Sequence, residues 1–546
     1  MEEFKKLFKM YKKIFKYRQI KQISIRFVCF EELDIENYLK DSKVSFQLNV
    51  ALIYFYIHNF IKRGYEVLCL GEYVNKKTGE IKAVKKIIDF SKEVNLSATY
   101  LKFYETNYTN YISFLCEKVG FSKVRDHCKG KYSKAFSYKE KYPKLKFVEA
   151  NNNYLLKRLF FLTRKYHQLR KANFNDSFYL TKLKPLLDDY QYLSIDLKAV
   201  KKYLDEKLDI WLLNKGSVLK VDFDYNDYVR DFLGASQVAN GFYKFKREKG
   251  NSDGRLHSEF QNLSKRMRQF VKLDNKPMYE ADISAAVPTI FIYYLNKLAE
   301  TAGEAQLPNN PNSITIKKDI ETNHLMLLDL HKKIDNDINE QNIIKNLQIA
   351  LPITQSQIWL REFTEELKDF KEHIFNDTLY QSFIEEYANS FIPADWGKAK
   401  DKQNKFISLF NTNDEKGMRN LMKKQFLSFL NADTESCSKY NRIKDIFKGR
   451  YPLIFAVLKE IKNIDLEKKH KLFSILVLQM ESKLILEIVC LEFKEMYPDC
   501  KLITIHDCIL TTEEYIDELN SFMKDRISKE LGININSKMK LVTTVM

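Results

Sequence analysis

The chain is poor in the residues that build linkers, disulfide frameworks and membrane spans. It has 15 glycines and 10 prolines in 546 residues, which leaves little material for flexible connections between domains. Its eight cysteines form no CxxC pair and no Cys/His cluster with the spacing of a zinc site. No run of 18 apolar residues is present, and the charged N-terminus does not fit a secretory signal. We therefore expect a cytoplasmic protein with reduced thiols and no membrane contact.

What the chain has in quantity is apolar and basic residues. Apolar residues make up 45% of the chain and aromatic residues 14%. A single core rarely grows beyond roughly 250 to 300 residues, so a chain of this length predicts two to four structural units. Lys and Arg total 90 against 72 for Asp and Glu, a formal net charge of +18. This surplus favours a polyanionic partner, although a generally lysine-rich composition is a competing explanation.

Two segments of the N-terminal half are rich in basic residues. Residues 1–26 have the spacing of a basic amphipathic helix, and a second basic stretch occupies residues 157–171. Both can contact phosphates, but a solvated helix face is the commoner explanation of such a pattern. Most of the region up to residue 230 has helical periodicity. For residues 1–230 we predict a mostly helical region, thumb-like or accessory, that binds nucleic acid or a protein partner.

Two aspartates occur at the ends of short apolar segments. Met278–Ile283 indicates a strand that presents Asp282, and Lys501–Ile505 indicates a strand that turns at His506 and Asp507. Nucleotide transfer by two metal ions needs both carboxylates at one site, where the ions lie roughly 3.5 to 4 Å apart. Mg²⁺ takes few protein ligands and completes its octahedron with water and phosphate oxygens. A lone aspartate after a strand is more often a turn residue, so the neighbouring motifs decide.

A series of short motifs connects the two aspartates. In chain order it comprises Gly254, Arg255 and Leu256; Asn262 and Leu263; the basic residues Lys265, Arg266 and Arg268; Ala281, Asp282 and Ile283; Arg419 and Lys423; Arg450, Tyr451 and Pro452; and His506 with Asp507. In order and spacing the series resembles the family A DNA polymerases, the group of bacterial DNA polymerase I, whose palm domain is shared with phage-type single-subunit RNA polymerases. The resemblance covers residues 250 to 546 and is closest to divergent members on bacterial phages and mobile elements.

The resemblance implies the identity of the catalytic and nucleotide-binding residues. Asp282 and Asp507 would be catalytic and would hold two Mg²⁺ ions, or Mn²⁺, together with the backbone carbonyl of Ile283. Arg419 and Lys423 lie four residues apart, which places both cations on one helix face. By resemblance they would bind the incoming triphosphate.

Further positions follow from the same resemblance or depart from it. Arg255, His506 and Gln479 would contact the primer-template. Val287 stands where DNA polymerases of the family keep a Glu that crowds the 2′ position of the sugar, so it is our candidate for sugar selection. Cys508 replaces the Glu that follows the family's second aspartate, a position where the RNA polymerases have Ser.

The predicted fold class is α+β, a right-hand polymerase. Residues 231–295 would form the first half of an antiparallel-sheet palm, 296–450 helical fingers and 451–546 the second half of the palm, after the mostly α-helical region of residues 1–230.

The predicted function is template-directed extension of a primer 3′ end by a DNA polymerase-like nucleotidyltransferase. Its partners would be nucleoside triphosphates and nucleic acid, either primer-template DNA or RNA. An RNA polymerase or primase, an untemplated nucleotide-adding enzyme and a non-catalytic nucleic-acid-binding protein are the alternatives. A role in replication, repair or defence does not follow from the sequence.

Overall fold

The structure is a computed structural model that describes part of the chain in detail. The described residues are 25–40, 48–68, 70–74, 81–96, 105, 107–125, 134–152, 155, 182–215, 222–241, 243, 245, 254–305, 357–389, 407–432, 442–463 and 471–542. The basic segments predicted at residues 1–26 and 157–171 lie outside these ranges, apart from the first two residues of strand β1.

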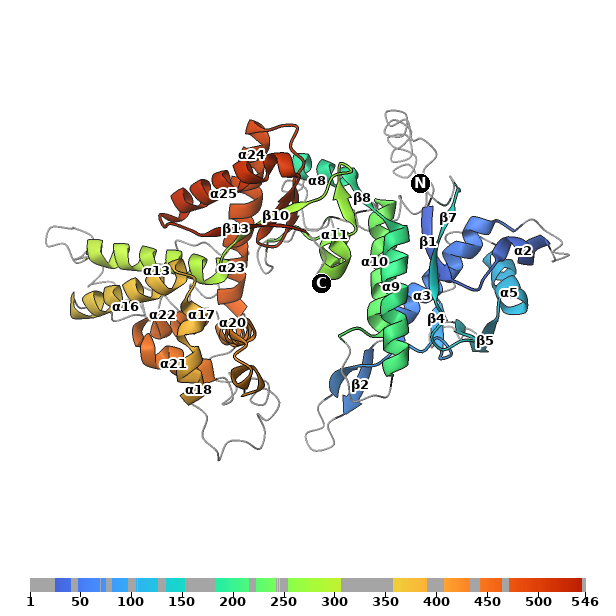
Figure 1. Cartoon of the computed structure of the whole chain (residues 1–546), viewed down its shortest axis with the longest axis horizontal. Helices are drawn as coiled ribbons and strands as arrows, with labels where there is room; N and C mark the ends of the chain where they lie inside the picture. The colour runs from blue at the N-terminus through green and yellow to red at the C-terminus, as the bar shows by residue number, and fades with distance from the viewer. Residues whose placement is uncertain are drawn as a thin grey trace, which may run out of the picture.

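The N-terminal part is a mixture of short antiparallel strands and helices (Figure 1). Its elements are β1 (Ile25–Phe30), α2 (Ile35–Lys40), α3 (Val50–Leu68), β2 (Leu70–Val74), β3 (Ile81–Lys85), β4 (Val94–Leu96), α5 (Tyr108–Lys118), β5 (Phe121–Arg125), β6 (Lys134–Tyr138) and β7 (Leu145–Ala150). Strand β1 pairs with β7, β2 with β3, and β6 lies between β4 and β5.

These strands correct the expectation of a mostly helical N-terminal region. Within the described residues from 25 to 150, seven strands alternate with three helices, so the helical prediction is wrong there. The strands are short, and β1 is buried at five of its six positions. A strand buried on both faces lacks the polar and apolar alternation that identifies a strand from sequence.

A helical layer follows, and here the predicted helices are present. It contains α8 (Lys184–Asp189), the 3₁₀ turn η2 (Tyr190–Tyr192), β8 (Leu193–Ile195), α9 (Leu197–Asn214), α10 (Tyr225–Asn240), α11 (Glu259–Asn262), α12 (Lys265–Arg268) and β9 (Val271–Leu273). Helices α9 and α10 pack side by side (Figure 1). Asp196 caps α9 by accepting hydrogen bonds from the backbone N–H groups of Lys198 and Ala199.

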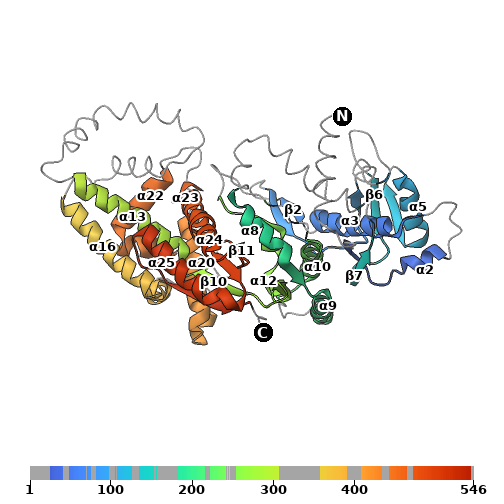
Figure 2. The same cartoon turned by 90° about the horizontal axis from the view of Figure 1, so that it is seen from above.

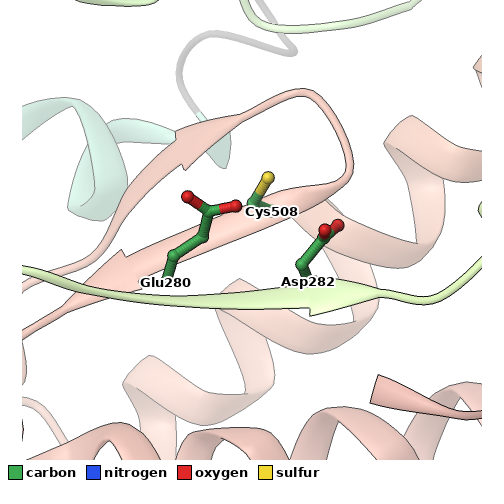
Figure 3. A group of neighbouring side chains, drawn as sticks. All are labelled: Glu280, Asp282 and Cys508. Atoms are coloured by element: carbon green, nitrogen blue, oxygen red, sulfur yellow. The ribbon is translucent and has the colours of Figure 1, made fainter. Parts of the chain in front are cut away.

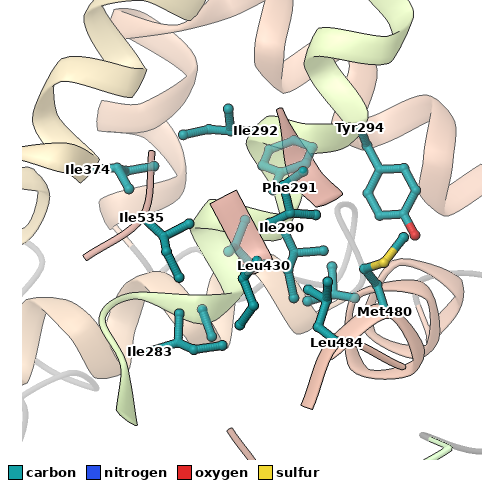
Figure 4. Packing of buried hydrophobic residues seen from close by; sticks show 14 of the residues in the cluster. Ile283, Ile290, Phe291, Ile292, Tyr294, Ile374, Leu430, Met480, Leu484 and Ile535 are labelled. Carbon is teal, nitrogen blue, oxygen red and sulfur yellow. The ribbon is translucent and has the colours of Figure 1, made fainter. Parts of the chain in front are cut away.

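The C-terminal part is largely helical. Its helices are α13 (Ala286–Ala305), α16 (Gln357–Phe375), α17 (Leu379–Ser382), α18 (Ile384–Asn389), α20 (Glu415–Asn431), α21 (Arg442–Arg450), α22 (Pro452–Asn463), α23 (Lys471–Ser482), the π-helical segment η5 (Lys483–Cys490), α24 (Leu491–Met496), the 3₁₀ turn η6 (Glu513–Tyr515) and α25 (Ile516–Leu531). Helix α13 lies beside α16 (Figures 1 and 2) and is continuous across residue 295. It also packs against α23, and Ile290, Leu430 and Leu484 belong to the same hydrophobic core (Figure 4).

A four-stranded antiparallel sheet joins the two parts of the molecule. It consists of β10 (Tyr279–Ile283), β11 (Ile503–Ile505), β12 (Cys508–Thr511) and β13 (Ser537–Leu541) in the order β11-β12-β10-β13. The strands predicted around both aspartates are therefore present and belong to one sheet.

The two faces of this sheet contribute to different hydrophobic cores. Ala281, Ile283 and Ile509 belong to the core of the C-terminal helices. Ile503 and Leu510, which point to the opposite face, belong to the core of the N-terminal part. The sheet is thus fixed from both sides, which suits a platform that must hold side chains in register.

Candidate active site

Strand pairing brings the candidate catalytic residues together. Asp282 of β10 lies directly opposite Cys508 of β12, and Cys508 immediately follows Asp507. Because side chains alternate between the two faces of a strand, Glu280 points to the same side as Asp282. Figure 3 shows Glu280, Asp282 and Cys508 projecting from one face of the sheet. The two predicted metal-binding aspartates are therefore within the same small region.

A tight hairpin turn presents His506 and Asp507. These two residues connect β11 to β12, whose ends pair through Ile505 and Cys508. His506 has φ 54° and is exposed. Left-handed backbone in a residue with a side chain costs roughly 1 kcal/mol, and tight hairpin turns require it because it matches the twist of the strands. The turn thus orients Asp507 through backbone geometry.

Asp282 occupies an unfavourable electrostatic environment for a carboxylate. Burial and the nearby charge of Asp507 raise its pKa to about 6, while Lys540 acts in the opposite direction. Within the described residues no group donates a hydrogen bond to Asp282 Oδ1, although this oxygen is shielded from solvent. A buried acceptor without a partner is costly, so the site is suited to binding a cation.

Cys508 contributes no negative charge to this cluster. Burial and the neighbouring Asp282 raise the pKa of its thiol far above the usual range, so the thiol keeps its proton. Its Sγ lies 3.9 Å from Asp507 Oδ1, to which it donates a weak hydrogen bond.

The donor atoms fit a divalent cation. Single ligand atoms of Glu280, Asp282 and Cys508 lie within 4.8 Å of one another, and Asp507 is close enough to raise the pKa of Asp282. Carboxylate oxygens are the ligands that Mg²⁺ and Mn²⁺ prefer. The carboxylates can hold such an ion without the protonated thiol.

The predicted primer-template residues form a second group beside the turn. Arg255 donates two hydrogen bonds to Glu481, one of them from Nε over 2.8 Å, and its Nη1 lies 3.4 Å from His506 Nδ1. Glu481 is almost fully buried, so the guanidinium offsets part of the cost of burying its charge. Partial desolvation of the ring and the charge of Arg255 lower the pKa of His506, which favours its neutral form. Arg255 and His506 are thus brought together.

Gly254 has the left-handed backbone with which this segment passes helix α23. It has φ 66°, and its carbonyl accepts a hydrogen bond from the Ser482 hydroxyl. A Cβ at this position would lie 3.5 Å from Cγ of Gln479, which places the predicted Gln479 next to the Gly254 segment.

Of the two predicted triphosphate-binding residues, Lys423 acts electrostatically on Asp282, whereas Arg419 is bound to another carboxylate. Lys423 is exposed on α20, and its charge lowers the pKa of Asp282. Arg419, one turn earlier, forms an ion pair with Asp377, and its Nε donates to Gln381 over 3.2 Å. In this structure Arg419 therefore binds a carboxylate of the chain.

The remaining predicted residues lie at the end of β10 and in the first turn of α13. Ile283 is buried, 4% exposed, and pairs with Ser537 of β13 at the end of β10. Val287 is half-buried in the first turn of α13, where it packs against the C-terminal core. Between them Ala285 has φ 54°, which turns the chain from the strand into the helix.

Sequence reasoning missed two charged residues of this site, Glu280 and Lys540. Glu280 Oε1 accepts from Lys540 Nζ over 2.7 Å, and the two residues are directly opposite on β10 and β13. The two-residue spacing of Glu280 and Asp282 on a strand could have indicated a shared face. Nothing local indicates the pairing with Lys540.

Comparison with known proteins does not assign the chain to a family. No family model matches the sequence, and no curated protein matches it. Among solved structures, the chain is similar to the POL domain of Pol1 from M. smegmatis in complex with DNA primer-template and dNTP. The likeness has 11% identity and a TM-score of 0.25, and it covers 71% of this chain and 73% of that one. Because these values establish neither a family nor a shared fold, the functional argument depends on the residues of the site.

In the described part of the chain, no helix combines the length and the apolar character needed to cross a bilayer.

Proposed function

We propose that the chain is a DNA polymerase-like nucleotidyltransferase that extends a primer 3′ end with Asp282 and Asp507 as catalytic metal ligands. The observation that carries this proposal is the pairing of β10 with β12, which places a carboxylate with one shielded, unsatisfied oxygen beside the turn with the second aspartate. The ordered motifs from Gly254 to Asp507 support it. When bound, two Mg²⁺ or Mn²⁺ ions would activate the attacking hydroxyl and stabilise charge on the leaving pyrophosphate.

The residues around the carboxylates have complementary roles in this proposal. Lys423, whose charge acts on Asp282, would neutralise the triphosphate. Arg255, positioned by Glu481, would contact the primer-template together with His506 and Gln479. Arg419 would bind phosphate only after leaving Asp377, and Val287 would limit the space beside the sugar.

The same proposal assigns regions to the chain. The sheet with Asp282 and Asp507 would be the palm, formed by residues 231–295 and 451–546, and the helices between its strands would be the fingers, residues 296–450. Residues 1–230 would form the accessory or thumb-like region, and the whole would have a right-hand layout.

Primer extension by single-site variants tests the proposal. Asp282→Asn and Asp507→Asn each remove one metal-binding charge, so we expect Mg²⁺-dependent extension of a labelled primer to fall at least 10³-fold, comparable to loss of a strong electrostatic contribution. Asp517→Asn, an exposed aspartate at the start of α25, is the matched control and should extend at the wild-type rate. Normal extension by both site variants would show that the assignment is wrong.

The product identifies the reaction further. Separate reactions with dNTPs and rNTPs, followed by sequencing of the product against the supplied template, distinguish a DNA polymerase from an RNA polymerase or primase and from an untemplated enzyme. We expect dNTP incorporation that copies the template. Preference for rNTPs would favour the RNA polymerase alternative, for which Val287 is the relevant difference.

A further inference from the structure

Glu280 is a carboxylate that the proposed reaction does not yet use. It lies two residues before Asp282 on the same face of β10, and its side chain is only 12% exposed. Carboxylates are seldom buried unless they are paired or bind a metal. Its pairing partner is Lys540, a residue of the edge strand β13.

Lys540 contributes positive charge close to these carboxylates. Its ammonium group lies 2.7 Å from Glu280 Oε1, and its charge lowers the pKa of Asp282. Glu280 and Asp507 act on Asp282 in the opposite direction. Three carboxylates, those of Glu280, Asp282 and Asp507, therefore share one region, in which Lys540 binds Glu280 directly and Lys423 also acts on Asp282. Each additional carboxylate makes binding of a divalent cation more favourable.

Glu280 is close enough to Asp282 for both to bind one cation. A carboxylate oxygen of Glu280 lies within 4.8 Å of those of Asp282, a separation that a shared cation can span. The third member of that cluster, Cys508, is a neutral thiol and a poor ligand for Mg²⁺. The anionic partner of Asp282 on this side is therefore Glu280, contributed by the same strand (Figure 3).

We propose that Glu280 is a third metal-binding carboxylate of the site. In this proposal the ammonium group of Lys540 stays paired with the Glu280 carboxylate until a divalent cation binds. The catalytic use of this cation rests on the proposed function, whereas cation binding itself is measured without primer extension. Binding of the cation displaces the ammonium of Lys540 from Glu280. Lys540 is then available to the phosphates of a bound nucleotide.

Binding of Mn²⁺ to the full chain without nucleic acid or nucleotide tests this inference. Electron paramagnetic resonance of free Mn²⁺ gives affinity and stoichiometry. We expect Glu280→Gln to weaken Mn²⁺ binding about tenfold, the lower end of the effect of residues around a metal. Lys540→Met should change affinity in the opposite direction and strengthen binding about threefold, because it removes the competing charge.

Lys538→Met is the matched control. Lys538 lies on the same strand and, by alternation, on the same face as Lys540, but it pairs with Asp377. We expect its Mn²⁺ affinity to equal that of the wild type. If Lys538→Met strengthens binding as much as Lys540→Met, general electrostatics explains the effect and the inference about Lys540 is wrong.

Two further outcomes would overturn the inference. One is wild-type Mn²⁺ affinity in Glu280→Gln, and the other is weaker binding in Lys540→Met. Glu280→Asp keeps the charge and should lie between wild type and Glu280→Gln, which provides a readout if the Gln variant does not fold. Altered Mn²⁺ binding without any primer extension would reject the proposed function alone. Unaltered binding with normal extension would reject only the role of Glu280.

Discussion

Asp282 illustrates how a residue can serve binding at the expense of folding. In the protein without metal its carboxylate is largely buried, faces Asp507 and has one oxygen without a donor among the described residues. Each of these features is unfavourable for the folded chain, and each becomes favourable when a cation is bound.

The stability of the metal-free protein should therefore increase when this charge is removed. The pKa of Asp282 is about 6 in the folded protein against an ordinary value of 3.8, so the folded chain binds a proton that the unfolded chain lacks between these values. Above pH 6 the charged form is destabilising, and the penalty disappears as the pH falls below 4. After allowance for partial exposure it is on the order of 2 kcal/mol.

Urea unfolding in EDTA measures this effect. At pH 7.5 Asp282→Asn should be more stable than the wild type by on the order of 2 kcal/mol, and at pH 3.5 the two should be equal. An Asn variant that is less stable at pH 7.5 would mean that the carboxylate makes favourable contacts in the folded state.

The residue scale also shows what a sequence can predict about a site. Asp282 and Asp507 were identified because each lies within a short local pattern. Glu280 was missed because its importance depends on a strand partner, Lys540, which lies far along the chain. Arg419 was assigned to a ligand because its spacing to Lys423 is local information, whereas its partner Asp377 is set by tertiary packing.

At the scale of elements, a buried ion pair connects the segment before β11 to helix α8. Asp189 is 3% exposed, and its carboxylate accepts from Lys494 Nζ at 3.0 Å and from the Leu502 backbone N–H at 2.8 Å. Lys494 also donates to the carbonyl of Cys500 at 2.6 Å. These bonds fix the loop that leads into β11, and with it the hairpin that presents Asp507.

Loss of Asp189 should destabilise the protein. Asp189→Ala leaves the buried ammonium of Lys494 without a counter-charge, and breaking such a pair costs about 3 kcal/mol or more. Asp189→Ala combined with Lys494→Met removes both charges and should recover part of the loss. Urea unfolding of the single and double variants gives the comparison. If the double variant is no more stable than the single one, the ion pair does not explain the effect.

Helices and strands were predicted correctly where a segment has a single clear apolar periodicity. Strands around Asp282 and Asp507 and the long helical run ending at Met496 follow from apolar periodicity and flanking turn residues. The π-helical segment Lys483–Cys490 within that run was not predicted, because its apolar face resembles that of an α-helix. The N-terminal sheets were missed because pairing between distant short strands leaves little local pattern.

At the scale of the whole molecule, the formal charge of +18 should dominate the first contact with nucleic acid. Each phosphate neutralised by Lys or Arg releases a counterion, so affinity depends on salt. We expect binding of a short DNA duplex to weaken at least tenfold between 50 and 200 mM NaCl, measured by fluorescence anisotropy. Asp282→Asn in EDTA should have the same salt dependence. An affinity independent of salt would contradict a binding mode dominated by phosphates.

The shared sheet has a consequence for how the chain is made. The N-terminal core includes Met278 and, from the hairpin, Ile503 and Leu510. During synthesis at 5 to 20 residues per second, the hairpin emerges from the ribosome roughly 10 to 50 s after Met278. Until then the N-terminal core lacks some of its apolar residues and leaves others exposed. The nascent chain should therefore depend on chaperones over that interval. The two carboxylates can come together only after the hairpin with Asp507 has been synthesised.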